Sequence, residues 1–160
     1  MIFENFNSQT YGHLNFDQTV EKLLSYIQID PGLTYELIIG TDSLLYTGSK
    51  AEFVSAIIVH KAKNGGIYFW SKHHEEHMHS LRQRIFQEAL LSLQLAEKLI
   101  EKLKELDQPD FNLTIHVDVG PNGETKKIMN EIVGMIKGNG FDVRTKPDSY
   151  GASKVADRHT

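Results

Sequence analysis

A chain of 160 residues, of which 40% are hydrophobic and 24% are charged, has the composition of a globular protein with one core, so a disordered chain is excluded. It contains no cysteine, which excludes disulfides, thiolate catalysis and cysteine-bound zinc. The formal net charge of −4 argues against binding nucleic acid by bulk electrostatics alone. No apolar run is long enough to cross a bilayer and the first residues lack a secretion signal, so we expect a cytoplasmic protein without membrane contact.

The first elements in chain order are one helix and three strands. Asn15 precedes a run of apolar residues at helical spacing, which predicts a helical appendage over residues 1–30, followed by a domain over residues 31–160. Three segments rich in β-branched and aromatic residues come next: TYELIIGTDS, EFVSAIIVHKA and GIYFWSK. Because their connections are short, they predict an antiparallel meander.

The later segments alternate between helix and strand. A long helix is predicted over residues 80–106, and it is followed by the strand FNLTIHVDVG, a glycine-bounded helix and the strand FDVRTK. The last segment, DSYGASKVADRHT, predicts a short helix with Asp148 or Ser149 as its cap. The order βββαβαβα predicts an α/β fold in which a mixed five-stranded sheet carries helices on both faces.

Two predicted strands end in an aspartate: Asp42 in LIIGTDS and Asp118 in HVDVG. Strand interiors disfavour aspartate, and open α/β sheets place their ligand sites at the carboxyl ends of strands. Either residue taken singly is explained more simply as a turn former. The occurrence of both in one small chain favours a shared site.

Glu88 is an acid on the apolar face of the long helix, in the same stripe as Leu95 and Leu99. A carboxylate there must be paired, neutralised or bound to a cation, because burying it alone costs several kcal/mol. The alternative to a cation is an ion pair with Arg84, one turn earlier.

A fourth acid is expected from the last helix. Asp157 follows the packing residues Val155 and Ala156, whereas its rival Asp148 stands where a helix cap is expected, so we prefer Asp157. Converging carboxylates without cysteine are the ligands of a hard divalent cation such as Mg²⁺ or Mn²⁺. Two such ions can clamp the attacking and leaving oxygens of a phosphodiester.

The element order, together with acids in the first strand, the long helix, the fourth strand and the last helix, resembles the ribonuclease H-like superfamily and its D-E-D-D carboxylate site. The segments IGTDS, GGIYFW, IHVDVGPNG and GFDVRTKPDSYGASKVADRHT also resemble the bacterial ribonuclease H-like family typified by YkuK, from about residue 14 onward. The resemblance implies metal-dependent cleavage of phosphodiesters in RNA, DNA or hybrids. It implies that Asp42 bridges two ions, that Glu88 and Asp118 hold one of them, and that Asp157 holds the other.

Basic and polar residues near these acids are candidates for substrate binding. From Lys126 onward the chain has seven Lys and Arg residues but only four acids, so this part of the chain can bind an anion. The substrate-binding candidates are Ser43, Arg84, Arg144 and Lys146.

Two other clusters have simpler explanations. The histidines between residues 73 and 79 are interpreted as a polar loop rather than as a transition-metal site, and the aromatic run 68–70 as core on one face, with the other face open to base stacking. The leading hypothesis is therefore a metal-dependent nuclease with Asp42, Glu88, Asp118 and Asp157 as ligands of two ions. The alternative is a non-catalytic ribonuclease H-like module that binds nucleic acid or a protein partner.

Overall fold

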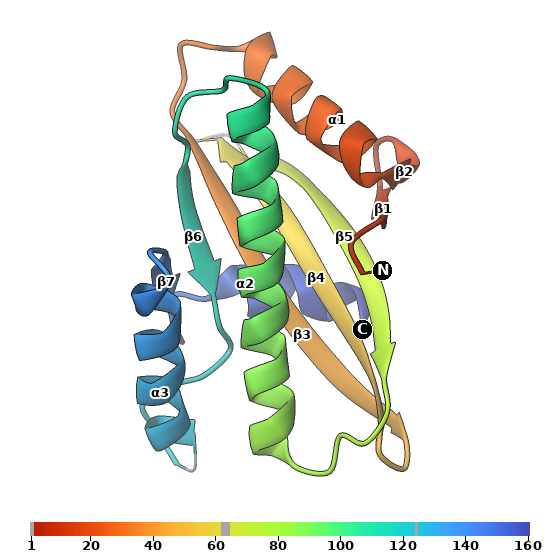
Figure 1. Ribbon diagram of the computed structural model, residues 1–160, viewed down its shortest axis with the longest axis vertical. Coiled ribbons are helices and arrows are strands. Elements are labelled where there is room, and N and C mark those ends of the chain that lie inside the picture. Colours follow the sequence, from red (N-terminus) through yellow and green to blue (C-terminus); the bar gives the residue numbers. More distant parts are fainter. Residues whose placement is uncertain (1, 62–64, 124) are drawn as a thin grey trace.

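The computed structural model describes residues 2–61, 65–123 and 125–160. Its strands form one mixed sheet, and helices lie on both faces of that sheet (Figure 1). The elements in chain order are β1 (Asn5–Ser8), β2 (Gly12–Asn15), α1 (Phe16–Ile29), β3 (Tyr35–Thr47), β4 (Lys50–Lys61), β5 (Gly66–Glu75), α2 (Leu81–Glu105), β6 (Asn112–His116), α3 (Thr125–Gly138), β7 (Asp142–Arg144), the π-helix η1 (Gly151–Ala156) and the 3₁₀ helix η2 (Asp157–His159).

The described residues form a sheet of seven strands in the order β2-β1-β5-β4-β3-β6-β7. β3, β4 and β5 are the expected antiparallel meander, and β6 and β7 are parallel to β3. The prediction of five strands is therefore wrong, because it did not include the two short strands β1 and β2. These were missed because each has four residues and buries a single apolar side chain, Phe6 or Leu14, which is too little for a recognisable alternation.

Helix α1 begins where the sequence predicts. The Asn15 side chain accepts a hydrogen bond from the Gln18 amide at 2.8 Å, and the Gln18 side chain accepts one from the Asn15 amide at 2.9 Å. This reciprocal capping box satisfies two amides that the first turn leaves without partners. The helix then buries Phe16, Val20 and Leu23 against the rest of the molecule.

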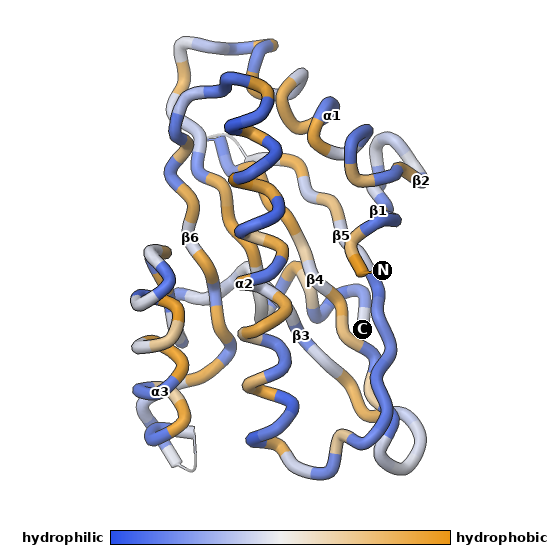
Figure 2. The backbone as a smooth tube through the Cα atoms, in the orientation of Figure 1, coloured by the Kyte–Doolittle hydropathy of each residue, from blue (hydrophilic) through white to orange (hydrophobic). Residues whose placement is uncertain are grey.

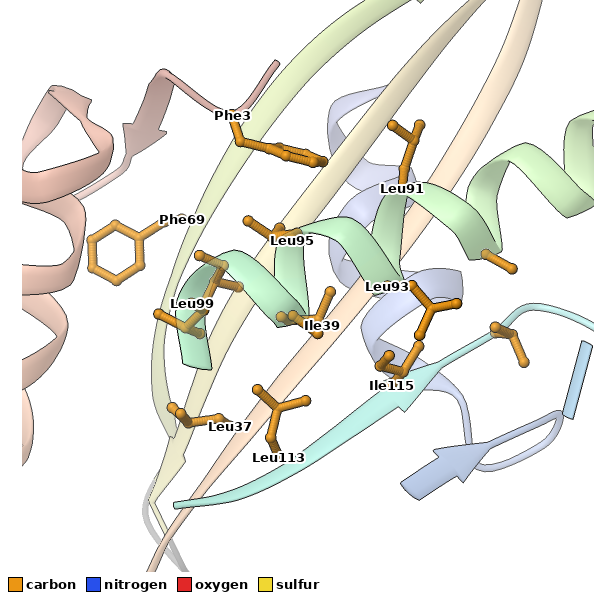
Figure 3. Close-up of a cluster of buried hydrophobic side chains, with 14 of the residues drawn as sticks. Phe3, Leu37, Ile39, Phe69, Leu91, Leu93, Leu95, Leu99, Leu113 and Ile115 are labelled. Atoms are coloured by element: carbon orange, nitrogen blue, oxygen red, sulfur yellow. The ribbon is translucent and has the colours of Figure 1, made fainter. Parts of the chain in front are cut away.

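The main core lies between α2 and the sheet. Leu37 and Ile39 of β3 point toward α2, where they pack against Leu95 and Leu99 (Figure 3). None of these four side chains has exposed surface. Alternation along the strand and the spacing of three to four residues along the helix produce this match. Figure 2 shows the corresponding hydrophobic stretches on α2 and on the strands that it covers. None of the helices in the described ranges is long and apolar enough to cross a membrane.

A smaller core on the opposite face holds the C-terminal helices, which cross behind β3 and β4 in Figure 1. Gly151 lies so close to the sheet that a β-carbon there would be 2.8 Å from Ile38 Cγ2 and 3.1 Å from His116 Nδ1. Its amide donates a 3.0 Å hydrogen bond to that same nitrogen. The start of η1 is therefore fixed against β3 and β6, and helices occur on both faces as predicted.

One local prediction is wrong. Asp42 does not end its strand, because β3 continues to Thr47 in a hairpin with β4, while the parallel neighbour β6 ends opposite Gly40. The π-helix η1 is preceded by Tyr150, which is itself in a helical conformation and whose side chain makes no cap hydrogen bond. The chain turns just before it, where the Asp148 amide donates to the Thr145 carbonyl at 2.8 Å.

Candidate functional site

The candidate site forms where β3 runs on past the end of β6. Successive residues of a strand point to opposite faces of its sheet. Accordingly, Asp42 meets Asp157 from the C-terminal helices on one face, and Ser43 meets Glu88 of α2 on the other. The strand thus brings two separate segments of the chain to one place.

Asp42 is half-buried and lies within hydrogen-bonding reach of Asp157. The pKa of Asp42 is raised from 3.8 to about 7, mainly by burial and then by the hydrogen bond and the charge of Asp157, with a smaller contribution from the charge of Asp118. A backbone hydrogen bond from Ser43 opposes this rise. A hydrogen bond between two carboxyl groups requires a proton on one of them. The raised pKa therefore favours a protonated Asp42 that can donate to Asp157.

Glu88 faces the sheet from α2 and accepts a hydrogen bond from the Ser43 hydroxyl to Oε2 at 2.5 Å. The pKa of Glu88 is raised from 4.5 to about 8, mainly by burial and in part by the charge of Asp42, while the Ser43 hydrogen bond opposes the rise. The alternative ion pair with Arg84 does not form within the described residues. Arg84 lowers the pKa of Glu88 through its charge alone, and its buried Nε has no hydrogen-bond partner in the described part of the chain.

Asp118 follows β6 by two residues and comes close enough to Asp42 and Glu88 for its charge to raise the pKa of both. Its Oδ1 atom is buried and accepts no hydrogen bond from any described residue. Lys146 Nζ lies 3.3 Å from this oxygen, within ion-pair distance but without hydrogen-bond geometry. A buried carboxylate oxygen without a donor is an acceptor that a cation can use.

The structure thus brings all four predicted acids to one end of the sheet, from four different segments. Carboxylate oxygens are the donors that a hard divalent cation prefers, so the donor set fits Mg²⁺ or Mn²⁺ in kind. Their side chains are not arranged around a common point: among the described residues, no group of three or more acidic or histidine side chains is placed to hold one ion.

The other expected residues lie around this cluster. Lys146 is next to Asp118, and its amide donates to the Val119 carbonyl at 2.8 Å, which fixes its backbone beside the acid. Arg84 is next to Glu88 on α2. Arg144, in contrast, pairs in register with His116 and lines a separate pocket.

The histidine and aromatic clusters contact groups outside the site. His73 lies 2.8 Å from Glu75 and His74 lies 3.1 Å from Glu52, as expected for a polar surface. Phe69 is buried in the main core, as predicted for one face of β5. On the other face Trp70 stacks on His159, with ring centres 3.8 Å apart, so the face expected to be open to bases is partly covered.

Sequence reasoning missed the hydroxyl groups that support the acids. Ser43 was expected to bind substrate, but its hydroxyl is donated to Glu88. One step inward, the buried Thr41 hydroxyl lies 2.8 Å from both Ser55 of β4 and Ser92 of α2. The signal was present in the sequence, because Thr41 and Ser92 are hydroxyl residues at positions that the periodicity turns inward.

Comparison with known proteins gives the same assignment as the resemblance. Residues 18–160 match the family described as Ribonuclease H-like. The chain is 31% identical over 169 aligned positions to YkuK of Bacillus subtilis (strain 168), a protein named as uncharacterized, and the match covers 97% of this chain and 96% of that protein. No solved structure matches the chain significantly. The chain belongs to the ribonuclease H-like superfamily and, within it, to the family of YkuK.

Proposed function

We propose that this protein is a divalent-metal-dependent nuclease that hydrolyses phosphodiester bonds in nucleic acid. The observation that carries the proposal is the meeting of Asp42, Glu88, Asp118 and Asp157 at one end of the sheet, where burial and mutual repulsion raise the pKa of two of them. Strongly perturbed carboxyl groups in a cluster are typical of catalytic and metal sites.

Mg²⁺ or Mn²⁺ is the group that this donor set fits, and two ions are expected. Asp42, Glu88, Asp118 and Asp157 would hold them, and the buried Oδ1 of Asp118, which accepts no hydrogen bond from a described residue, supports this assignment. When bound, such ions activate a water molecule and neutralise charge on the reacting phosphate.

The surrounding residues have separate roles in this proposal. Ser43 positions Glu88, because its hydroxyl already donates to that carboxylate. Lys146 has a half-exposed side chain beside Asp118, where it can contact a phosphate of the substrate. Arg84 supplies positive charge beside Glu88.

One contact favours the alternative, a non-catalytic module that binds nucleic acid or a protein partner. Lys146 lies 3.3 Å from Asp118, so an internal cation already offsets part of the charge of the cluster. In such a module the acids would be structural, and Lys146 would remain with Asp118 whether or not metal is added.

The test combines thermal unfolding with cleavage of labelled RNA, DNA and hybrid strands, in Mg²⁺ or Mn²⁺. A ligand at 100 times its Kd stabilises the folded state by about 2.7 kcal/mol, so saturating metal is expected to raise the Tm of the wild type by several degrees. Asp42→Asn is expected to lose both the stabilisation and the cleavage. Glu97→Gln, which changes an exposed acid on α2, is the matched control and keeps both.

The outcomes separate the two functions. Cleavage that is present in the wild type and in Glu97→Gln, and absent in Asp42→Asn, supports the nuclease. If millimolar metal produces neither stabilisation nor cleavage in the wild type, the nuclease is abandoned. Binding of nucleic acid that is indifferent to metal and to Asp42→Asn would establish the module instead.

A further inference from the structure

A second pocket lies on the same face of the sheet as the C-terminal helices. It has a volume of about 640 Å³, and its polar and aromatic lining is formed by Glu36, His116, Arg144, Asp148, Tyr150 and Lys154. Arg144 is opposite His116 in the register of β6 and β7, and Lys146 and Asp118 follow two residues later on each segment. Asp118 therefore follows the pocket residue His116 by two residues along the chain.

The His116 side chain lines this pocket and is held in a fixed orientation. Its residue surface is 2% exposed, and its Nδ1 accepts the 3.0 Å hydrogen bond from the Gly151 amide. The hydrogen of the neutral ring is therefore on Nε2. The edge of the ring packs against Tyr150 at 4.9 Å and 82°, so the orientation of this donor is fixed.

Four charged side chains share the pocket without neutralising one another. Arg144, Lys154, Glu36 and Asp148 line it, and none of them forms an ion pair within the described ranges. Two cations and two acids balance in charge, so a bare anion would meet repulsion as well as attraction. A ligand that carries both an anionic group, for the two cations, and hydrogen-bond donors, for the two acids, would be complementary to all four side chains.

A nucleotide has this combination. Its phosphate pairs with guanidinium and ammonium groups, its exocyclic amino groups donate to carboxylates, and its base stacks on aromatic rings. Tyr150 is the half-buried ring that lines the pocket, and the volume lies within the range of small-molecule sites.

We propose that this pocket binds a nucleotide, with the phosphate on Arg144 and Lys154, the base against Tyr150 and its amino groups facing Glu36 and Asp148. The nucleotide has two possible sources, a free mononucleotide or one unit of a strand whose neighbouring phosphate lies at the carboxylates. The strand source rests on the proposed nuclease function. The free nucleotide does not, because the pocket contains none of the four acids of the candidate site.

The experiment is a titration of the full chain, in EDTA, with each nucleoside 5′-monophosphate, with inorganic phosphate and with a short single strand, followed by amide NMR shifts. EDTA prevents metal-dependent cleavage, so binding is measured alone. The expected result is mononucleotide binding with shifts at His116, Arg144 and Tyr150. Arg144→Glu is expected to weaken it at least about tenfold, the effect of losing one charge-assisted contact.

One control separates this pocket from general charge effects. Lys104→Glu makes the same change of charge on an exposed part of α2 and is expected to keep wild-type affinity. A strand that binds more tightly than the mononucleotide, with both weakened by Arg144→Glu, identifies the strand as the source. Equal affinity identifies the free nucleotide.

Three results would overturn the proposal: no nucleotide binding at millimolar concentration, shifts confined to other residues, or inorganic phosphate binding as tightly as the nucleotides. An unfolding curve for Arg144→Glu shows that lost binding is not lost folding, and Tyr150→Leu provides a second variant in which the preference for nucleotide over phosphate should disappear. If nucleotides bind but Mn²⁺ neither stabilises the chain nor supports cleavage, the nuclease proposal fails while the pocket stands.

Discussion

The same two elements, β3 and α2, behave differently at their two ends. At one end Leu37 and Ile39 pack on Leu95 and Leu99 with no exposed surface. At the other end the same strand and helix present Asp42, Ser43 and Glu88, and two carboxyl groups there have raised pKa values. The periodicity of strand and helix does not change between the ends. What changes is the residue type between strand and helix, where Ser43 and Glu88 follow the aliphatic residues, while Asp42 lies on the other face of the strand. One helix–strand pair therefore provides stability at one end and reactive groups at the other.

The boundary between the two ends is a layer of hydroxyl groups. Thr41 lies 2.8 Å from Ser55 and 2.8 Å from Ser92, and all three residues are buried. Hydroxyl groups can satisfy one another in a dry interior, which neither a carboxylate nor an aliphatic side chain can do. The layer therefore separates the core from the acids without leaving a polar atom unpaired.

The largest expected effect is at the apolar end. Leu99→Ala leaves a cavity beneath α2 and should lower the free energy of unfolding by about 2–5 kcal/mol, as judged by urea denaturation. Glu97→Ala, an exposed neighbour on the same helix, should change it by less than about 0.5 kcal/mol. Similar losses for both variants would mean that the two faces of α2 do not differ as described.

Changes in the hydroxyl layer should cause the second-largest loss in the free energy of unfolding. Thr41→Val keeps the shape of the side chain but removes the hydroxyl that both serines contact, at an expected cost of about 1–3 kcal/mol. Adding Ser92→Ala should cost less than it does in the wild type, because its partner is already absent. Strict additivity in this double-mutant cycle would argue that the layer is not one network.

The carboxylate end should respond to pH in the opposite way from an ordinary acid. The folded-state pKa of Glu88 lies near 8, above its ordinary value of 4.5, so the folded state prefers the protonated form. Stability in EDTA is therefore greatest below pH 4.5 as far as this group is concerned, and it is lost as the pH rises toward about 8. Glu88→Gln should remove part of this loss and be more stable than the wild type at high pH by about 1–2 kcal/mol, since one pKa unit is worth about 1.4 kcal/mol. Identical pH slopes in the two proteins would contradict the assignment.

The smallest expected change in stability is that of a substitution at Ser43. Ser43→Ala removes the donor to Glu88 Oε2, so the pKa of Glu88 should rise further and stability above neutral pH should fall by about 0.5–1.5 kcal/mol. Carboxyl ¹³C shifts of Glu88 measure the pKa directly. Ser49→Ala, in the β3–β4 hairpin, is the matched control and should leave the Glu88 titration unchanged.

Much of this arrangement could be predicted from residue patterns. The order from β3 to β7 followed from alternation, helical spacing and turn residues, and Glu88 was recognisable as an acid in an apolar stripe. β1 and β2 were not predictable, because each buries only one apolar side chain and depends on pairing with β5 or with the other strand.

The contacts within the site were beyond sequence patterns for a related reason. The approach of Asp157 to Asp42 depends on how the C-terminal helices cross the sheet, and that crossing is determined by a close contact between distant segments. Metal binding by these acids stays a prediction.

That contact is made at Gly151, and it places an evolutionary constraint on the chain. Any side chain at this position must displace a branched methyl group of Ile38 or the ring of His116. The helix that would move carries Asp157 toward the acids and begins beside Tyr150 of the second pocket. One added methyl group would therefore disturb both places together, so neither can drift independently in descendants of this sequence. Gly151 should persist even where the residues around it change.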